Sequence, residues 1–181
     1  TLYCDDISST KRQACINFLG LILDLLLKWF APILSFTTEE IFQIINQGQN
    51  SSIHLQTFPN IPAKWKDEKL FEKWEKFKIV KKVVNAALEE KRANKDIGSS
   101  LEADVKIYLN DEYLKIVKDF DLPENFITSK AIAKKLTNDD GLFKLDGVKD
   151  VKVLVKKAEG EKCPRCWKIF PNPCERCELI N

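Results

Sequence analysis

Four cysteines near the end of the chain constrain its folding more than any other sequence feature. They form two Cys-x-x-Cys turns, Cys163-Pro-Arg-Cys166 and Cys174-Glu-Arg-Cys177, with seven residues between the turns. Each turn can aim two sulfur atoms at one point, and tetrahedral Zn²⁺ takes four thiolate ligands at about 2.3 Å. We therefore expect one Zn²⁺ ion, bound by Cys163, Cys166, Cys174 and Cys177.

A site of four cysteines leaves no open coordination position, so we expect it to be structural. The segment around it has almost no hydrophobic core, and metal binding would then supply most of its folding free energy. The alternatives are disulfides or a thioredoxin-like redox pair. Disulfides are uncommon in cytosolic proteins, and a redox motif normally occurs once, beside a βαβ pattern.

Composition indicates a globular cytoplasmic chain. Of 181 residues, 44% are hydrophobic, and the net charge of +2 is too small to hold nucleic acid by charge alone. The apolar stretch from Ile16 to Phe30 is interrupted by Asp24 and Lys28, so we expect a buried helix and no membrane span. No targeting or lipidation signal is recognised. The chain begins within a packed pattern and has no Met, which predicts a piece of a longer protein.

Apolar spacing predicts three helices that pack as a small bundle. The first follows the capping residues 8–10 and ends at Pro32. The second opens at Thr37, where a capping box with Glu40 is possible, and stops at Gly48. The third and longest covers residues 67–94.

After the third helix, apolar and polar residues alternate strictly, which predicts a strand over residues 101–109. A short helix capped by Asp111 and further strands near 126–132 and 151–155 complete a small α+β unit, and Gly160 marks a linker. The predicted fold class is mainly α, a helical bundle followed by a small α+β unit and a Cys₄ zinc knuckle or ribbon tail. The expected boundaries are 1–95, 96–157 and 158–181.

The sequence offers no catalytic centre. Its only histidine, His54, lies in a predicted loop, where a core-edge or solvent role is expected. No Gly-rich phosphate loop and no G-x-S-x-G motif is present. A self-sufficient enzyme is therefore not expected.

Five stretches together carry a family resemblance: LYCD (2–5), APILSFTTEEIF (31–42), VNAALEE (84–90), IGSSLEA (97–103) and GEKCPRCW (160–167). In this order they resemble the C-terminal region of bacterial isoleucyl-tRNA synthetases. The second stretch is shared by several class I synthetases, whereas the fourth, followed by a Cys₄ tail, is similar to the isoleucine enzymes. The seven residues between the cysteine turns are fewer than is usual in that family.

The resemblance implies that residues 1–95 belong to a helical anticodon-binding domain and that the zinc tail engages tRNA. The expected partners are tRNA-Ile and the remainder of a monomeric synthetase chain, which would perform ATP-dependent aminoacylation. ATP would bind only in the absent catalytic domain, because this chain has one His where the HIGH signature needs two, and no KMSKS.

The expected tRNA contacts are basic and aromatic residues suited to phosphates and unstacked bases. Packing of the tryptophan on the metal turn, and ordinary ion pairs on the solvated face of the long helix, are the structural alternatives. A zinc-stabilised module that docks on protein is the alternative function. The candidates are Arg165, Trp167, Lys168 and Arg176 in the tail, and Lys81, Lys82, Lys91, Arg92 and Lys95 on the helix.

Overall fold

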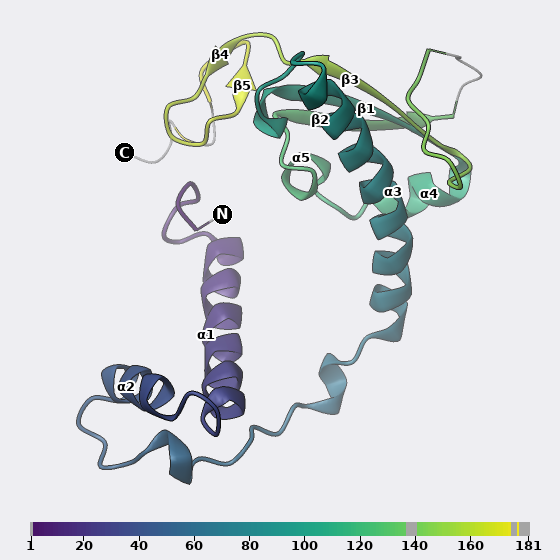
Figure 1. The fold of residues 1–181 in the computed structure, drawn as a ribbon. Coiled ribbons are helices and arrows are strands. Elements are labelled where there is room, and N and C mark those ends of the chain that lie inside the picture. The colour runs from purple at the N-terminus through teal and green to yellow at the C-terminus, as the bar shows by residue number, and fades with distance from the viewer. Residues whose placement is uncertain (1, 137–140, 175–176, 178–181) are drawn as a thin grey trace. The chain divides into compact units, whose positions relative to one another are not determined.

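The computed structural model describes residues 2–136, 141–174 and 177, which divide into two compact units at residues 66 and 67 (Figure 1). The first unit contains α1 (Thr10–Phe30), α2 (Ser35–Ile45) and two short 3-10 turns, η1 (Ile53–Leu55) and η2 (Ala63–Trp65). Ser9 caps α1 by accepting a hydrogen bond from the backbone N–H of Arg12. The first predicted helix is thus confirmed.

The core of the first unit is small. Leu27 and Ala31 from the end of α1 pack with Phe42 of α2 and Ile53 of η1, and these four residues are buried. Glu39 of α2 fastens the following connection, because its carboxylate accepts from the Ser52 hydroxyl at 2.7 Å and the Ile53 N–H at 2.9 Å. These contacts fix η1 against the two helices.

The prediction that α1 is a buried helix is wrong for this unit. Only Leu27 of its residues is buried, since α2 and η1 cover one side of one end. By length and composition alone, α1 is also long and apolar enough to cross a membrane, contrary to our expectation, although core helices of soluble proteins share both properties. Its exposed apolar residues are Ile16, Phe18, Leu19, Leu21, Leu23, Leu26, Trp29 and Phe30.

The start of α2 also differs from the prediction. The helix begins at Ser35, two residues before Thr37, and its N-cap Leu34 makes no side-chain capping bond. Thr37 and Glu40 therefore lie inside the helix, so the predicted capping box does not form. The turn after Phe30, closed by N–H bonds from residues 33 and 34 to the Phe30 carbonyl, sets the earlier start.

The second unit is a three-stranded sheet covered by helices. It contains α3 (Glu68–Ala93), η3 (Ser100–Glu102), β1 (Ala103–Leu109), α4 (Asp111–Val117), α5 (Leu122–Asn125), β2 (Lys130–Lys135) and β3 (Val151–Lys157). The strand order is β2-β1-β3, with β1 parallel to β2 and antiparallel to β3. The parallel pair is joined through α4 and α5, as a parallel connection requires.

The apolar stripe of α3 lies against this sheet and not in a three-helix bundle as predicted. Phe77, Val80, Val84 and Leu88 are buried in one cluster with the inward residues of β1 and β3. The Phe77 ring stacks on Phe120, with ring centroids 4.2 Å apart. The stripe indicated a buried face correctly, but its period carries no information about which element covers it.

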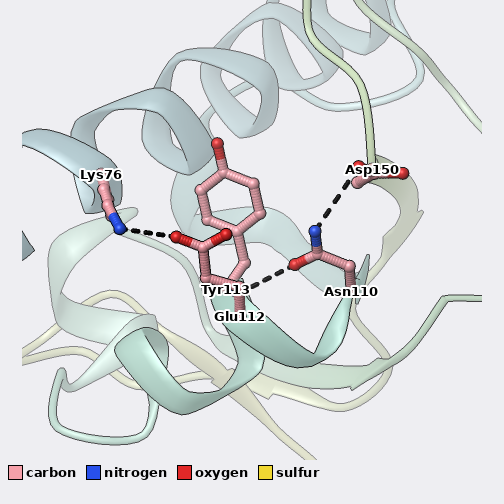
Figure 2. Close-up of polar contacts among 5 residues, drawn as sticks. All are labelled: Lys76, Asn110, Glu112, Tyr113 and Asp150. Carbon is pink, nitrogen blue, oxygen red and sulfur yellow. Dashed lines mark hydrogen bonds and ion pairs between the residues drawn. The ribbon is translucent and has the colours of Figure 1, made fainter.

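The start of α4 is held by polar contacts to two neighbouring segments (Figure 2). Asn110 caps α4 by accepting from the Tyr113 N–H at 2.9 Å and donates toward Asp150, which precedes β3. Lys76 of α3 and Glu112 form an ion pair at 2.5 Å. The cap is therefore Asn110 and not Asp111, and α4 ends at Val117.

The strands near residues 101–109 and 151–155 are confirmed as β1 and β3. The strand expected near 126–132 begins later, at Lys130, because residues 126–129 form the turn that ends α5. Ile127 has a positive φ of 56°, and the Thr128 N–H donates to the Pro123 carbonyl at 3.0 Å.

Candidate metal centre and nucleic-acid surface

The cysteine-rich tail begins as a short hairpin of β4 (Glu161–Lys162) and β5 (Ile169–Phe170). Gly160 precedes it with a φ of +124°, and a Cβ at this position would lie 2.0 Å from the Phe170 carbonyl oxygen. The close approach of these two backbones requires a residue without a side chain. The predicted linker glycine is thus a structural part of the hairpin.

The first cysteine turn is shaped by backbone hydrogen bonds. The Trp167 N–H donates to the Cys163 carbonyl at 2.9 Å, and the Cys163 N–H donates to the Lys168 carbonyl at 2.8 Å. Trp167 adopts a positive φ of 64° to close the turn. In the second turn the Cys177 N–H donates to the Cys174 carbonyl at 2.8 Å. Both turns bring their cysteines to the same side of the hairpin.

The four sulfur atoms meet in one cluster. The Sγ atoms of Cys163, Cys166, Cys174 and Cys177 all lie within 4.8 Å of one another, and those of Cys166 and Cys174 are 3.7 Å apart. A disulfide requires about 2.05 Å, whereas thiolates around a tetrahedral Zn²⁺ ion stand about 3.8 Å apart, given a Zn–S distance of 2.3 Å. The cluster could therefore hold a metal ion, and its four cysteines are free and not joined in disulfides.

The environment shifts the pKa values of three of the clustered thiols in different directions. The pKa of Cys163 is lowered to about 7, mainly because its sulfur accepts a hydrogen bond from the Cys166 N–H. Burial raises the pKa of Cys166 and of Cys177. The lowered pKa favours the thiolate of Cys163, whereas burial favours the protonated thiols of Cys166 and Cys177, which would lose their protons on binding a metal ion.

A residue that the sequence did not single out attaches the tail to the sheet unit. The buried Ser129 hydroxyl, just before β2, donates to the Leu101 carbonyl and accepts from the Ile169 N–H of β5 at 2.6 Å. The hydroxyl therefore bridges the backbone at Leu101 and the backbone at Ile169, which are 68 residues apart in the chain. Its position inside the strand predicted near residues 126–132 gave no signal of this role.

The predicted tail contacts gather on the hairpin. Trp167 is 60% exposed, with the Lys162 ammonium 5.8 Å from its ring centroid. Arg165 is exposed and Lys168 is half-buried. All three residues are close in sequence to Cys163 and Cys166 of the cluster. Arg176 lies outside the described residues.

The predicted helix contacts lie on the C-terminal half of α3 and just after it. Lys91 pairs with Asp96 at 2.9 Å, and Arg92 pairs with Glu89 at 2.5 Å. Lys81 and Lys82 make no ion pair within the described part of the chain. Exposed pairs such as those of Lys91 and Arg92 contribute little energy, so they do not prevent phosphate contacts. Lys95, with a φ of 60°, is exposed beyond the helix end.

Comparison with known proteins identifies the family of the chain. The model of the anticodon-binding domain of tRNA ligases matches residues 1–107. The isoleucine–tRNA ligase of Pelagibacter ubique (strain HTCC1062) is 46% identical over 175 residues, which cover 97% of this chain and 18% of that protein. That of Bradyrhizobium diazoefficiens is 45% identical over 170 residues, covering 93% of the chain and 17% of the relative.

The isoleucine–tRNA ligase of Rhodopseudomonas palustris is 42% identical over 94% of the chain and 17% of the relative. The chain thus spans less than a fifth of the length of these relatives. The resemblance to isoleucyl-tRNA synthetases is confirmed, and the domain model covers more than half of the chain. The chain belongs to the family of anticodon-binding domains of tRNA ligases.

Proposed function

We propose that this chain is the anticodon-side, tRNA-binding part of an isoleucine–tRNA ligase and serves aminoacylation of tRNA-Ile by the longer enzyme. The observation that carries the proposal is similarity to an isoleucine–tRNA ligase along 97% of the chain, which agrees with the domain match at residues 1–107. The chain has one histidine and no KMSKS, so it is expected to be inactive alone, with ATP bound elsewhere in the enzyme.

The proposed functional division is 1–95 for the anticodon-binding region, 96–157 for the junction and 158–181 for the tail. We further propose that the tail binds one structural Zn²⁺ ion. The donor set of four soft thiolates and the 3.7 Å separation of two of them support zinc. Bound zinc would hold the hairpin in shape, and Cys163, Cys166, Cys174 and Cys177 would fill its coordination sphere.

The proposed role of the tail is to present Trp167 and its basic neighbours to tRNA. A tryptophan with a positive φ costs about 1 kcal/mol or more in backbone strain, and here the ring is exposed and not buried in a core. Strain without burial supports a function for the ring, such as stacking on an unpaired base. Arg165, Lys168 and Arg176 would contact phosphates there, as would Lys81, Lys82, Lys91, Arg92 and Lys95 on and after α3.

The test of the function is tRNA binding by the 181-residue chain loaded with zinc. We expect tighter binding to tRNA-Ile than to bulk RNA, and a dissociation constant that increases with salt because phosphate contacts release counterions. Equal affinity for tRNA-Ile and bulk RNA at every salt concentration would contradict anticodon-side recognition by this chain.

Substitution of Trp167 separates RNA contact from a structural role. Glycine adopts a positive φ without strain, so Trp167→Gly should make the metal-loaded tail more stable by about 1 kcal/mol. If the ring stacks on a base, affinity for tRNA should nevertheless fall by at least about fivefold. Chelator competition measures the first effect and filter binding the second. Unchanged tRNA affinity would favour the alternative, docking on protein, which the relatives do not favour.

The remaining proposals follow from the longer enzyme. A cytoplasmic, monomeric ligase is expected, because aminoacylation of tRNA takes place where proteins are made. The chain's own partners would then be tRNA-Ile and the rest of the ligase chain. Size-exclusion chromatography with light scattering on the full-length enzyme tests the monomer.

A further inference from the structure

The sheet β2-β1-β3 has one face that the helices of its unit do not cover. Every second residue of β1, from Ala103 to Leu109, is buried in the core. These residues pack against α3, α4 and the segment that follows α5. The intervening residues Asp104, Lys106 and Tyr108 point to the other face and are half-buried. Strand alternation thus separates an apolar face from a second, polar one.

The register places the residues of this second face, here called the open face, in three rows across the sheet. Each β1 residue stands between one partner from β2 and one from β3. Neighbouring strands lie about 4.8 Å apart and successive rows about 6.7 Å apart. The rows are Lys130–Asp104–Lys156, Ile132–Lys106–Leu154 and Lys134–Tyr108–Lys152.

Positive charge is concentrated on the open face. Its nine positions carry five lysines and one aspartate, a net charge of +4, whereas the whole chain has only +2. The rest of the chain therefore carries a net charge of −2. Lys130, Lys134 and Lys156 are exposed and the other two lysines are half-buried. A local surface of this kind attracts polyanions even though the chain as a whole is nearly neutral.

The third row places an aromatic ring between two of these charges. Tyr108 lies on the central strand, with Lys134 and Lys152 as its cross-strand partners. An aromatic ring on an open sheet, with cations on both sides, matches the requirements of an unpaired nucleotide, whose base stacks on the ring while flanking phosphates meet the cations. An acidic peptide that adds a strand would instead need a free sheet edge.

The open face also lies next to the tail. Ser129, which accepts from the Ile169 N–H of β5, directly precedes Lys130 of the first row. The tail therefore attaches to the sheet at the end where the first row lies.

We propose that the open face of the sheet binds a single-stranded segment of RNA, with Tyr108 stacked on a base and Lys134 and Lys152 on the adjoining phosphates. This inference rests on the proposed function, in which the RNA is tRNA. It concerns a surface separate from the tail and from the predicted lysines of α3.

The test compares three variants of the 181-residue chain, loaded with zinc and checked for folding by circular dichroism. Lys134→Ala/Lys152→Ala and Tyr108→Leu alter the open face. Lys115→Ala/Lys118→Ala is the matched control, because it removes two exposed lysines on and just after α4, away from the open face. The probes are a tRNA-Ile transcript and a single-stranded RNA of twelve nucleotides.

We expect the open-face double variant to bind both probes about tenfold more weakly. The slope of log affinity against log salt should become shallower by about 1.4, since each lost single-strand phosphate contact removes about 0.7. Tyr108→Leu should weaken binding at least about fivefold without changing the slope. The control double variant should keep the tyrosine-dependent stacking and lose clearly less affinity than the open-face variant.

The outcomes distinguish this proposal from the proposed function. If tRNA binds and only Trp167 variants weaken it, the open-face proposal is overturned while the function stands. If the chain does not prefer tRNA-Ile but both open-face variants weaken the short RNA, the open face stands and the function fails. Binding of neither probe, or open-face binding of an acidic peptide with unchanged RNA affinity, overturns the open-face proposal.

Discussion

At the scale of single residues, a few backbone positions determine whether the tail can form. Gly160 and Trp167 both have positive φ values, at the start of the hairpin and at the end of the first cysteine turn. Only the first has a backbone oxygen where a side chain would go. Position 160 therefore cannot hold a side chain, whereas position 167 holds one at the cost of backbone strain.

Replacement of Gly160 by alanine should destabilise the tail by about 1–3 kcal/mol, because the new Cβ would overlap the Phe170 carbonyl and separate β4 from β5. Chelator competition should then show metal affinity reduced by about five- to 150-fold. Gly147→Ala is the matched control, since Gly147 also has a positive φ, of 80°, but open space around its Cβ position. Equal effects of the two substitutions would show that strain alone, and not backbone contact, explains the loss.

The thiol pKa values predict how metal affinity depends on pH. Bound metal requires thiolates, so the metal-bound tail carries fewer protons than the free tail, and affinity rises with pH. Because burial raises the pKa of Cys166 and Cys177, each should release a proton at pH 7.5. Cys163, with a pKa of about 7, adds a further proton mainly below that pH.

Calorimetry of zinc binding in buffers with different ionisation enthalpies measures this proton release. At least two protons per Zn²⁺ are expected at pH 7.5, with more at pH 6. Release of fewer than two protons at pH 7.5 would mean that the thiols of the free tail are already ionised.

At the scale of elements, α3 shows how tertiary packing selects the partner of an amphipathic helix. Its bounds, Glu68 and Ala93, agree with the predicted range of 67–94. Its buried side, however, completes the core of the sheet unit, together with aromatic rings that follow α4 and α5. The helix thus belongs structurally to the strands that come after it in the chain.

Truncation of Phe77 tests this assignment. The ring is fully buried between α3 and the sheet unit, so Phe77→Ala should reduce the free energy of unfolding by about 3–5 kcal/mol. Phe71, on the same helix, is 63% exposed, and Phe71→Ala should change it by less than about 0.5 kcal/mol. Urea denaturation followed by circular dichroism measures both. Similar losses of unfolding free energy in the two variants would mean that Phe77 does not lie on the buried face of α3.

At the scale of the whole molecule, the two compact units differ in how much core they contain. Among the described residues, four buried apolar side chains form the core of the first unit, against eighteen in the second. Many large apolar side chains of α1 and α2 are exposed. The first unit should therefore be much less stable than the second within these 181 residues.

Hydrogen exchange in increasing urea should reveal this difference directly. We expect peptides of α1 and α2 to lose protection at lower urea than peptides of β1 and β3, because opening the first unit exposes less apolar surface. Mass spectrometry of the two peptide sets provides the measurement. A single transition shared by both units would show that they unfold as one.

Much of the local structure was predictable from sequence. The cap at Ser9, the bounds of α3 and the alternation in β1 and β3 each depend on neighbouring residues, and the structure agrees with these predictions. The cap of α2 and the start of β2 were missed, since turn bonds around Phe30 and Thr128 override the local pattern.

Local sequence was enough to predict the long helices, β1, β3 and the four candidate metal ligands, because caps, periods and Cys-x-x-Cys spacing act over a few residues. The fold was needed to show which surface covers α3, that Ser129 joins the tail to the sheet, and that five lysines and Tyr108 share one open face. These facts depend on contacts between residues far apart in the chain, and periodicity shows that a face is buried or exposed without identifying its neighbour.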